Sequence, residues 1–174
     1  MQTVQLVVGV GLFCAVLVPV QAEQPSPRQA ALTDLARDIV EQYPDIPHVD
    51  VHALQDRLAG VTLIDVREPA EFAVSRIPGA ININDADTLL AFARTHDKPL
   101  VLYCSVGRRS ADFTELLHRA GEAQAVNFVG SIFAWGNQGM ALEDDQGTTD
   151  AVHPYNWFWG WRYLDAQLHA SKPR

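Results

Sequence analysis

One cysteine of this chain stands where it could act as a nucleophile. In the stretch VLYCSVGRRSADFTELL, residues 101–117, an apolar run ends in Cys104 and is followed by a glycine, two arginines and a serine. Ligands of open α/β sheets bind at the carboxyl ends of strands, where we expect Cys104 to lie. Gly107 permits a tight turn, and Arg108 and Arg109 add positive charge. We therefore expect an anion-binding loop that lowers the pKa of the cysteine below its free value of about 8.5.

The helix after this loop is expected to begin near Ser110, with its free N–H groups and its dipole directed at the loop. The hydroxyl of Ser110 either donates to the sulfur or caps the helix. The alternative interpretation is an inert structural cysteine beside two surface arginines. Such a cysteine is normally flanked by apolar residues, whereas polar residues crowd one side of Cys104. The pattern therefore favours a reactive thiol.

The spacing of the arginines indicates which anion the loop holds. Cysteine phosphatases place an arginine six residues after the nucleophile, so that the loop wraps a phosphate. Here the sixth residue after Cys104 is Ser110, and the arginines fall at the fourth and fifth positions. The shorter loop is expected to hold something smaller than phosphate, such as one sulfur atom on the cysteine.

The elements that must position this loop alternate between strands and helices. Runs of strand formers and amphipathic or capped segments distinguish the two. We expect strands in residues 61–66, 77–83, 99–104 and 124–130, and helices in residues 29–43, 68–74, 85–96, 110–121 and 131–139. Residues 48–60 are expected to begin as a short extended piece and to continue as a helix that ends at Gly60. This alternation predicts an α/β fold with a mostly parallel sheet and helices on both faces.

Four segments resemble the rhodanese superfamily. They are CSVGRRS at 104–110, LIDVREPAEF at 63–72, IPGAINI at 77–83 and NFVGSIFAW at 127–135. The segments follow the family's order and spacing, and the resemblance covers about residues 49–142. Two departures are mild: Ser75-Arg76 replaces a common Gly-His, and Val129-Gly130 replaces a common Gly-Gly.

The resemblance implies a rhodanese-like fold and sulfur transfer without a cofactor. A rhodanese takes the outer sulfur of thiosulfate or a similar anionic donor onto its cysteine and passes it to a thiol or to cyanide. By position, Cys104 would be the nucleophile and persulfide carrier. The implied loop residues are Ser105, Val106, Gly107, Arg108, Arg109 and Ser110. The two alternatives are a persulfide carrier that delivers sulfur to a partner protein with low turnover and, less favoured, a cysteine phosphatase or arsenate reductase.

Other polar residues have weaker claims to function. Asp65 and Arg67 end another predicted strand near the same sheet edge and could tune the site, although the resemblance implies a mostly structural pair. His48 and His52 have the spacing of metal ligands on a helix, but an extended segment is favoured here, so we expect no metal site. The acidic run EDDQG at 143–147 is expected to be a solvated loop.

The first residues are expected to direct export. The apolar run at 6–20 is shorter than the roughly 20 residues that span a bilayer, and Val20 and Ala22 suit a cleavage site. We expect a signal peptide at 1–22, cleavage after Ala22, and a periplasmic protein without stable membrane association. The alternative is an uncleaved membrane anchor, because no lysine or arginine precedes the apolar run. Cleavage would remove Cys14 and leave Cys104 without an internal disulfide partner.

The rest of the mature chain divides into three predicted parts. They are a linker and helix at 23–48, a rhodanese-like domain at 49–145 and an aromatic-rich extension at 146–174. We expect the aromatic rings at 157–161 to pack on the domain surface, together with the first helix; a lid over Cys104 or a docking patch for a protein partner is the alternative. The formal net charge of -8 argues against nucleic acid as a partner.

Overall fold

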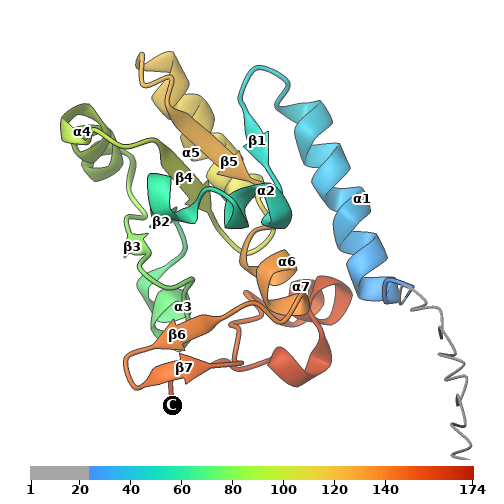
Figure 1. Cartoon of the computed structure of the whole chain (residues 1–174). Helices are drawn as coiled ribbons and strands as arrows, with labels where there is room; N and C mark the ends of the chain where they lie inside the picture. The colour runs from blue at the N-terminus through green and yellow to red at the C-terminus, as the bar shows by residue number, and fades with distance from the viewer. Residues whose placement is uncertain (1–23) are drawn as a thin grey trace, which may run out of the picture.

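The computed structural model describes residues 24–174, and a five-stranded parallel sheet forms its centre (Figure 1). The strands are β1 (His48–Val49), β2 (Thr62–Asp65), β3 (Ile81–Asn82), β4 (Leu100–Tyr103) and β5 (Ala125–Phe128), in the order β1-β5-β4-β2-β3. All four pairings are parallel, which confirms the predicted α/β class. The order makes β4 the central strand, so the residue that follows β4 lies at the middle of the sheet edge.

Helices cover both faces of the sheet. They are α1 (Pro27–Gln42), α2 (Val51–Gln55), α3 (Pro69–Val74), α4 (Ala86–Thr95), α5 (Arg108–Arg119), α6 (Ser131–Asn137) and α7 (Trp157–Tyr163). Alternate residues of β4 belong to different cores, because successive side chains of a strand point to opposite faces. Leu102 packs in one cluster with residues of α4 and α5, whereas Val101 and Tyr103 pack in another with residues of α2 and α6. Both faces of the sheet are therefore apolar, as is typical of a parallel sheet that helices cover on both sides.

The two ends of the described chain pack on each other. Helix α1 contacts α7, and Arg28 Nε donates a hydrogen bond of 2.9 Å to the carbonyl of Trp161. A capping box fixes the start of α1, since the Ser26 hydroxyl accepts from the amide of Gln29 while the Gln29 side chain accepts from the amide of Ser26. The predicted packing of the first helix against the aromatic segment is confirmed.

The acidic run at 143–147 is not the solvated loop that we expected. It joins β6 (Leu142–Asp144) and β7 (Gly147–Thr149) in an antiparallel hairpin at one end of the molecule (Figure 1). Gly147 has a φ of +121°, and Asp144 accepts a hydrogen bond of 2.7 Å from the amide of Gln146. The turn is therefore built from an Asx contact and a glycine, a pattern that charge composition alone conceals.

The aromatic segment is only partly packed. Trp159 packs against the core, but Trp157 is 78% exposed, Phe158 51% and Trp161 53%. The expectation that these rings pack on the domain surface is wrong for the three exposed residues. The rings of Trp157 and Trp161 stack on each other instead, with centroids 6.1 Å apart.

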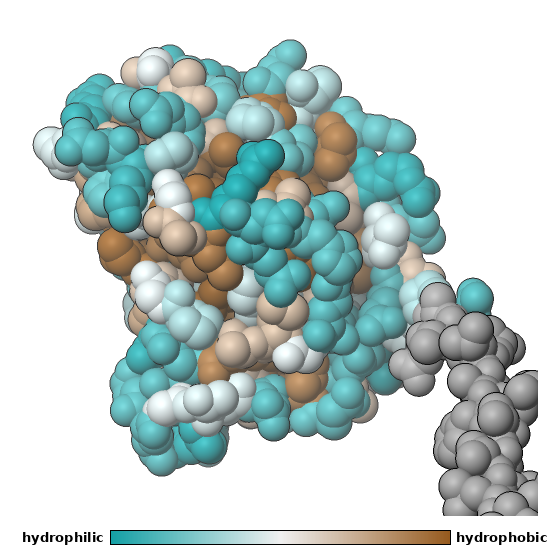
Figure 2. Space-filling model, viewed as in Figure 1, coloured by the Kyte–Doolittle hydropathy of each residue, from teal (hydrophilic) through white to brown (hydrophobic). Residues whose placement is uncertain are grey.

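The surface shown in Figure 2 is mainly hydrophilic, with apolar residues gathered near its centre, where Figure 1 shows the sheet and α2. Within residues 24–174, no helix combines the length and the apolar character needed to cross a bilayer. The predicted signal peptide and its cleavage site lie outside the described residues.

Candidate active site

Cys104 follows the last residue of the central strand, and a glycine turns the chain directly into a helix. Helix α5 begins at Arg108, two residues before the predicted start at Ser110, and Gly107 is its N-cap with a φ of +107°. A Cβ at Gly107 would lie 3.0 Å from Cα of Val129, so no larger residue fits without displacing the backbone. The early start places both arginines in the first helical turn.

The loop is held by its carbonyl groups. Those of residues 104–106 accept hydrogen bonds from the amides at the start of α6: Ile132 to Cys104 at 3.2 Å, Phe133 to Ser105 at 3.1 Å and Gly130 to Val106 at 3.0 Å. In a planar trans peptide, the next N–H points away from the carbonyl. The amides of residues 105–107 therefore point away from α6, and the amide of Gly107 donates to Sγ of Cys104 at 3.2 Å. Of the cradle of amides that the sequence predicts, the hydrogen bond from Gly107 to the sulfur is the contact that the structure shows.

Two residues that sequence reasoning missed also fix the loop. The Ser131 hydroxyl accepts from the amide of Cys104 at 3.1 Å and donates to a carbonyl of β5 at 2.7 Å. The side chain of Asn127 donates to the carbonyl of Gly107 at 3.1 Å and accepts from the hydroxyl of Ser110 at 2.7 Å. Ser110 therefore does not cap the helix, and its oxygen lies 3.7 Å from Sγ. Both of these residues lie in the motif NFVGSIFAW, and their place in that motif is the only sequence feature that could have indicated a role at the loop.

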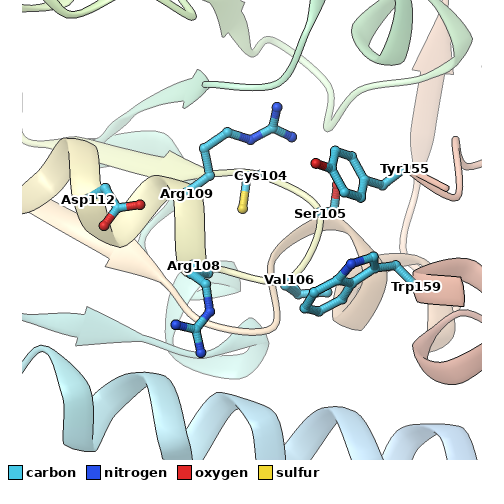
Figure 3. Close-up of a pocket in the computed structure, with 8 residues that line it drawn as sticks. All are labelled: Cys104, Ser105, Val106, Arg108, Arg109, Asp112, Tyr155 and Trp159. Carbon is cyan, nitrogen blue, oxygen red and sulfur yellow. The ribbon is translucent and has the colours of Figure 1, made fainter.

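The two arginines, which the sequence treats alike, have different surroundings. Nη2 of Arg109 pairs with the buried carboxylate of Glu71 at 3.1 Å, and the same carboxylate accepts from the hydroxyl of Ser105 at 3.2 Å. Arg108 points toward α1 and donates to the side chain of Gln42 at 2.6 Å (Figure 3). The structure thus brings Arg109 to the site with Glu71, a partner that sequence reasoning missed, and directs the charge of Arg108 outward.

A pocket of about 190 Å³ opens over Cys104. Its lining residues are Cys104, Ser105, Val106, Arg108, Arg109, Asp112, Tyr155 and Trp159 (Figure 3). Cys104 is only 2% exposed, so reagents reach its sulfur through this pocket. The volume greatly exceeds the space that one water molecule needs, and it is smaller than the usual pocket for a drug-sized ligand.

Two ionisable groups near the pocket have shifted pKa values. Burial alone would lower the pKa of Arg109, but its interactions with Cys104 and Glu71 together raise it above its ordinary value. The guanidinium therefore stays charged beside the sulfur. Burial and the hydrogen bond to Asp112 raise the pKa of Tyr43 to about 12. This phenol stays protonated near neutral pH and donates to the carboxylate of Asp112 at 2.5 Å.

Asp65 and Arg67 form a fully buried ion pair. Nε and Nη2 of Arg67 donate to the Asp65 carboxylate at 2.9 and 2.6 Å, and Nη2 also donates to the carbonyl of Ser75 at 2.6 Å. Neither side chain lines the pocket over Cys104. The contacts support the structural interpretation, in which the pair ties the end of β2 to the segment after α3.

His48 and His52, whose spacing could suit metal ligands, do not belong to a metal-binding cluster in the described part of the chain. Among residues 24–174, no group of three or more histidine, cysteine or acidic side chains is placed to hold an ion. The ring of His48 instead contacts the carbonyl of Tyr43 at 2.9 Å and the side chain of Asn127 at 3.2 Å.

Comparison with known proteins identifies relatives of this chain. The chain matches the model of the rhodanese-like domain over residues 50–138. A sulfurtransferase of Allochromatium vinosum is 30% identical over 106 residues, which are 59% of this chain and 99% of that protein. The human thiosulfate:glutathione sulfurtransferase is 31% identical over 51% of this chain and 92% of its own length. The crystal structure of a Pseudomonas aeruginosa thiosulfate sulfurtransferase has the same fold, with a TM-score of 0.54 and 20% identity over 73% of this chain and 26% of that one.

The chain belongs to the rhodanese-like domain family, as its motifs predicted. Its relatives support a general role in sulfur transfer by a rhodanese-type transferase, with a sulfur donor and a sulfur acceptor as substrates. The matched segment ends at residue 138, before the hairpin and α7.

Proposed function

We propose that this protein transfers a sulfane sulfur from thiosulfate, or a similar anionic donor, to a thiophilic acceptor through a persulfide on Cys104. The observation that carries the proposal is the setting of the sulfur. Sγ lies at the floor of a pocket, accepts the Gly107 amide at 3.2 Å, and has the charged Arg109 close by. These groups place a hydrogen-bond donor and a positive charge where an anionic sulfur donor would meet the cysteine.

The proposed reaction has two balanced steps. The thiolate of Cys104 attacks the outer sulfur of thiosulfate, the S–S bond of the donor breaks, and sulfite leaves with the electron pair. An acceptor thiolate or cyanide then attacks the outer sulfur of the persulfide, and Cys104 leaves as a thiolate. No external oxidant or reductant is required, and the kinetics are expected to be ping-pong.

Intact-mass analysis of protein recovered from the exported fraction tests the proposal. Treatment with thiosulfate is expected to add the mass of one sulfur atom, and Cys104→Ser is expected to gain none. Cyanide should remove the added sulfur and produce thiocyanate. Hydrolysis of an aryl phosphate without any gain of sulfur would contradict the proposal and favour the phosphatase alternative, which the loop length already disfavours.

The mass of the protein recovered from the exported fraction also tests where the protein is located. We propose that residues 1–22 direct export to the periplasm and are removed after Ala22. The apolar run and the small residues before the cleavage site support this proposal. The measured mass is expected to correspond to a chain that begins at Glu23. A mass that includes the apolar run, found with the membrane fraction, would instead support the uncleaved anchor.

The structure predicts different effects for the two arginines. Arg109→Ala is expected to slow both persulfide formation and the alkylation of Cys104 at neutral pH by about 10-fold, because it removes a cation beside the sulfur that helps to bind the donor. Arg108→Ala is the matched control and should change both rates less than about threefold, because its guanidinium pairs with Gln42. Stopped-flow measurements of loading and alkylation check this. Equal effects of the two substitutions would contradict the assignment.

A persulfide carrier is the second candidate function. The exposed aromatic rings of α7 favour it, because soluble proteins rarely leave several large rings uncovered and adjacent. A carrier would load sulfur stoichiometrically and turn over slowly with cyanide and small thiols. Rapid steady-state turnover would favour the enzyme instead.

A further inference from the structure

The pocket over Cys104 has two chemically different walls. One is the cysteine loop with the first turn of α5, which carries the charged residues. The other consists of Tyr155 and Trp159, which come from the segment after the part that matches the family model (Figure 3). The aromatic wall is thus supplied by the C-terminal extension, not by the matched rhodanese-like segment.

Tyr155 is held in place by its own backbone. It has a φ of +64°, a left-handed conformation that is unfavourable for a residue with a side chain. Its amide donates to Nδ1 of His153 at 3.1 Å. Burial lowers the pKa of His153 although Glu71 opposes the shift, so the ring stays neutral and can accept this hydrogen bond. A strained residue persists only where its surroundings fix it, and strain of this kind gathers at functional sites.

The neighbouring segment is equally constrained. A Cβ at Gly160 would lie 2.4 Å from Cβ of Pro154, so the loop before α7 packs directly on the helix backbone. Asn156 caps α7 by accepting from the amide of Trp159 at 3.1 Å. Trp159 also packs against the ring of Tyr163 at 5.3 Å. Trp159 is therefore held by these contacts, whereas Tyr155 is positioned by its backbone and remains 49% exposed.

The Tyr155 ring also contacts the charged wall. The guanidinium of Arg109 lies 5.5 Å from the centroid of this ring, within the range of a cation–π contact. A small inorganic dianion needs only the amides and the cation, because the electron-rich face of an aromatic ring repels negative charge. The ring faces instead suit an apolar or planar organic group beside the sulfur.

We propose that Tyr155 and Trp159 form an acceptor subsite that selects low-molecular-weight thiols with an apolar, planar body, such as aryl thiols. The inference rests on the proposed persulfide of Cys104. The ring of the acceptor packs between the two side chains while its thiolate attacks the outer sulfur of the persulfide. The bond between that sulfur and Cys104 breaks, the acceptor becomes the persulfide, and the Cys104 thiolate again accepts the amide of Gly107.

Single-turnover discharge tests the subsite. Protein is loaded with thiosulfate, freed of excess donor and mixed with thiophenol or with cyanide. Tyr155→Ala is expected to lower the rate of discharge to thiophenol by about 10-fold while discharge to cyanide changes less than about twofold. Tyr155→Phe, which keeps the ring, should retain the wild-type rate with thiophenol. Equal losses with both acceptors would overturn the proposal, because they would show that Tyr155 acts on the loop through Arg109.

A binding measurement separates failure of the subsite from failure of the proposed function. Thioanisole carries the aryl group but has no thiol that could react. We expect it to bind unloaded wild-type protein and Cys104→Ser with equal affinity, and Tyr155→Ala about 10-fold more weakly. If no persulfide forms but this pattern holds, the aryl site stands and the sulfur chemistry fails. If thioanisole binds Tyr155→Ala as well as wild type, the subsite is wrong whatever the chemistry.

Discussion

Gly107→Ala is expected to slow persulfide formation by about 100-fold. Gly107 has a φ of +107°, and an added Cβ would lie 3.0 Å from Cα of Val129 and 3.1 Å from the carbonyl of Phe128. These neighbours are backbone atoms of the segment that holds the loop, so they cannot make room by a change of side-chain rotamer. The loop must shift instead, and its amide would leave Sγ. A misplacement of about 1 Å is enough to cost a reaction roughly 100-fold.

Gly79→Ala is the matched control for this prediction. Gly79 also has a positive φ, +77°, but an added Cβ there would have no atom within 4 Å. It should lose about 1–2 kcal/mol of stability through backbone strain alone and keep its rate of loading. Circular dichroism establishes that each variant is folded, and the rate of sulfur loading per folded molecule is then measured by mass. A Gly107→Ala protein that loads at the wild-type rate would show that the amide does not matter.

Arg67→Met is expected to lower the free energy of unfolding by about 3–5 kcal/mol. Both side chains of the Asp65–Arg67 pair are fully buried, and the substitution would leave the carboxylate without its partner inside the protein. Burial alone would lower the pKa of Arg67, but the nearby Asp65 raises it above its ordinary value, so this arginine stays charged near neutral pH. Urea denaturation measures the loss.

Two comparisons identify the cause of that loss. A double substitution, Asp65→Asn with Arg67→Met, removes the stranded charge and should recover part of the stability. Arg37→Met breaks an ion pair whose side chains are 63% and 69% exposed, and it should leave the urea midpoint almost unchanged. If the single and double variants at the buried pair were equally unstable, lost packing rather than an uncompensated charge would be the cause.

The sequence predicts the position of the cysteine well, because that position follows from local patterns. An apolar run ending in Cys104, a glycine and a helix are all read from neighbouring residues. The partners Glu71 and Ser131 lie 33 and 27 residues away, and the motifs that contain them do not show which residues contact the loop. Such contacts arise only when the sheet brings the ends of its strands together.

Helix geometry explains why the two arginines could not be separated from the sequence. Consecutive residues of a helix point about 100° apart, so only one of the two neighbouring arginines that line the pocket can reach Glu71. The helix start decides which one does, and starts are predicted less reliably than the presence of a helix. The predicted helix start was Ser110, but the left-handed Gly107 lets the helix begin at Arg108. With this start, Arg109 is the residue that pairs with Glu71.

The aromatic segment shows a second limit of prediction from the sequence. Its composition indicates rings that should be buried, but composition does not say which side of a short helix meets the protein. In the structure, Trp159 faces the core and the pocket, while Trp157 and Trp161 face outward. Tyr155 was not singled out in the sequence at all, because its role depends on the φ of +64° that turns its ring over Arg109.

The bonds from the start of α6 to the carbonyls of residues 104–106 have a consequence for the order in which the molecule is made. A growing chain that has reached only β5 already contains its cysteine but none of the amides of residues 130–133. Synthesis must therefore pass α6 before the thiol gains its binding site. A chain that ends near residue 129 would therefore contain Cys104 without the amides that hold its loop.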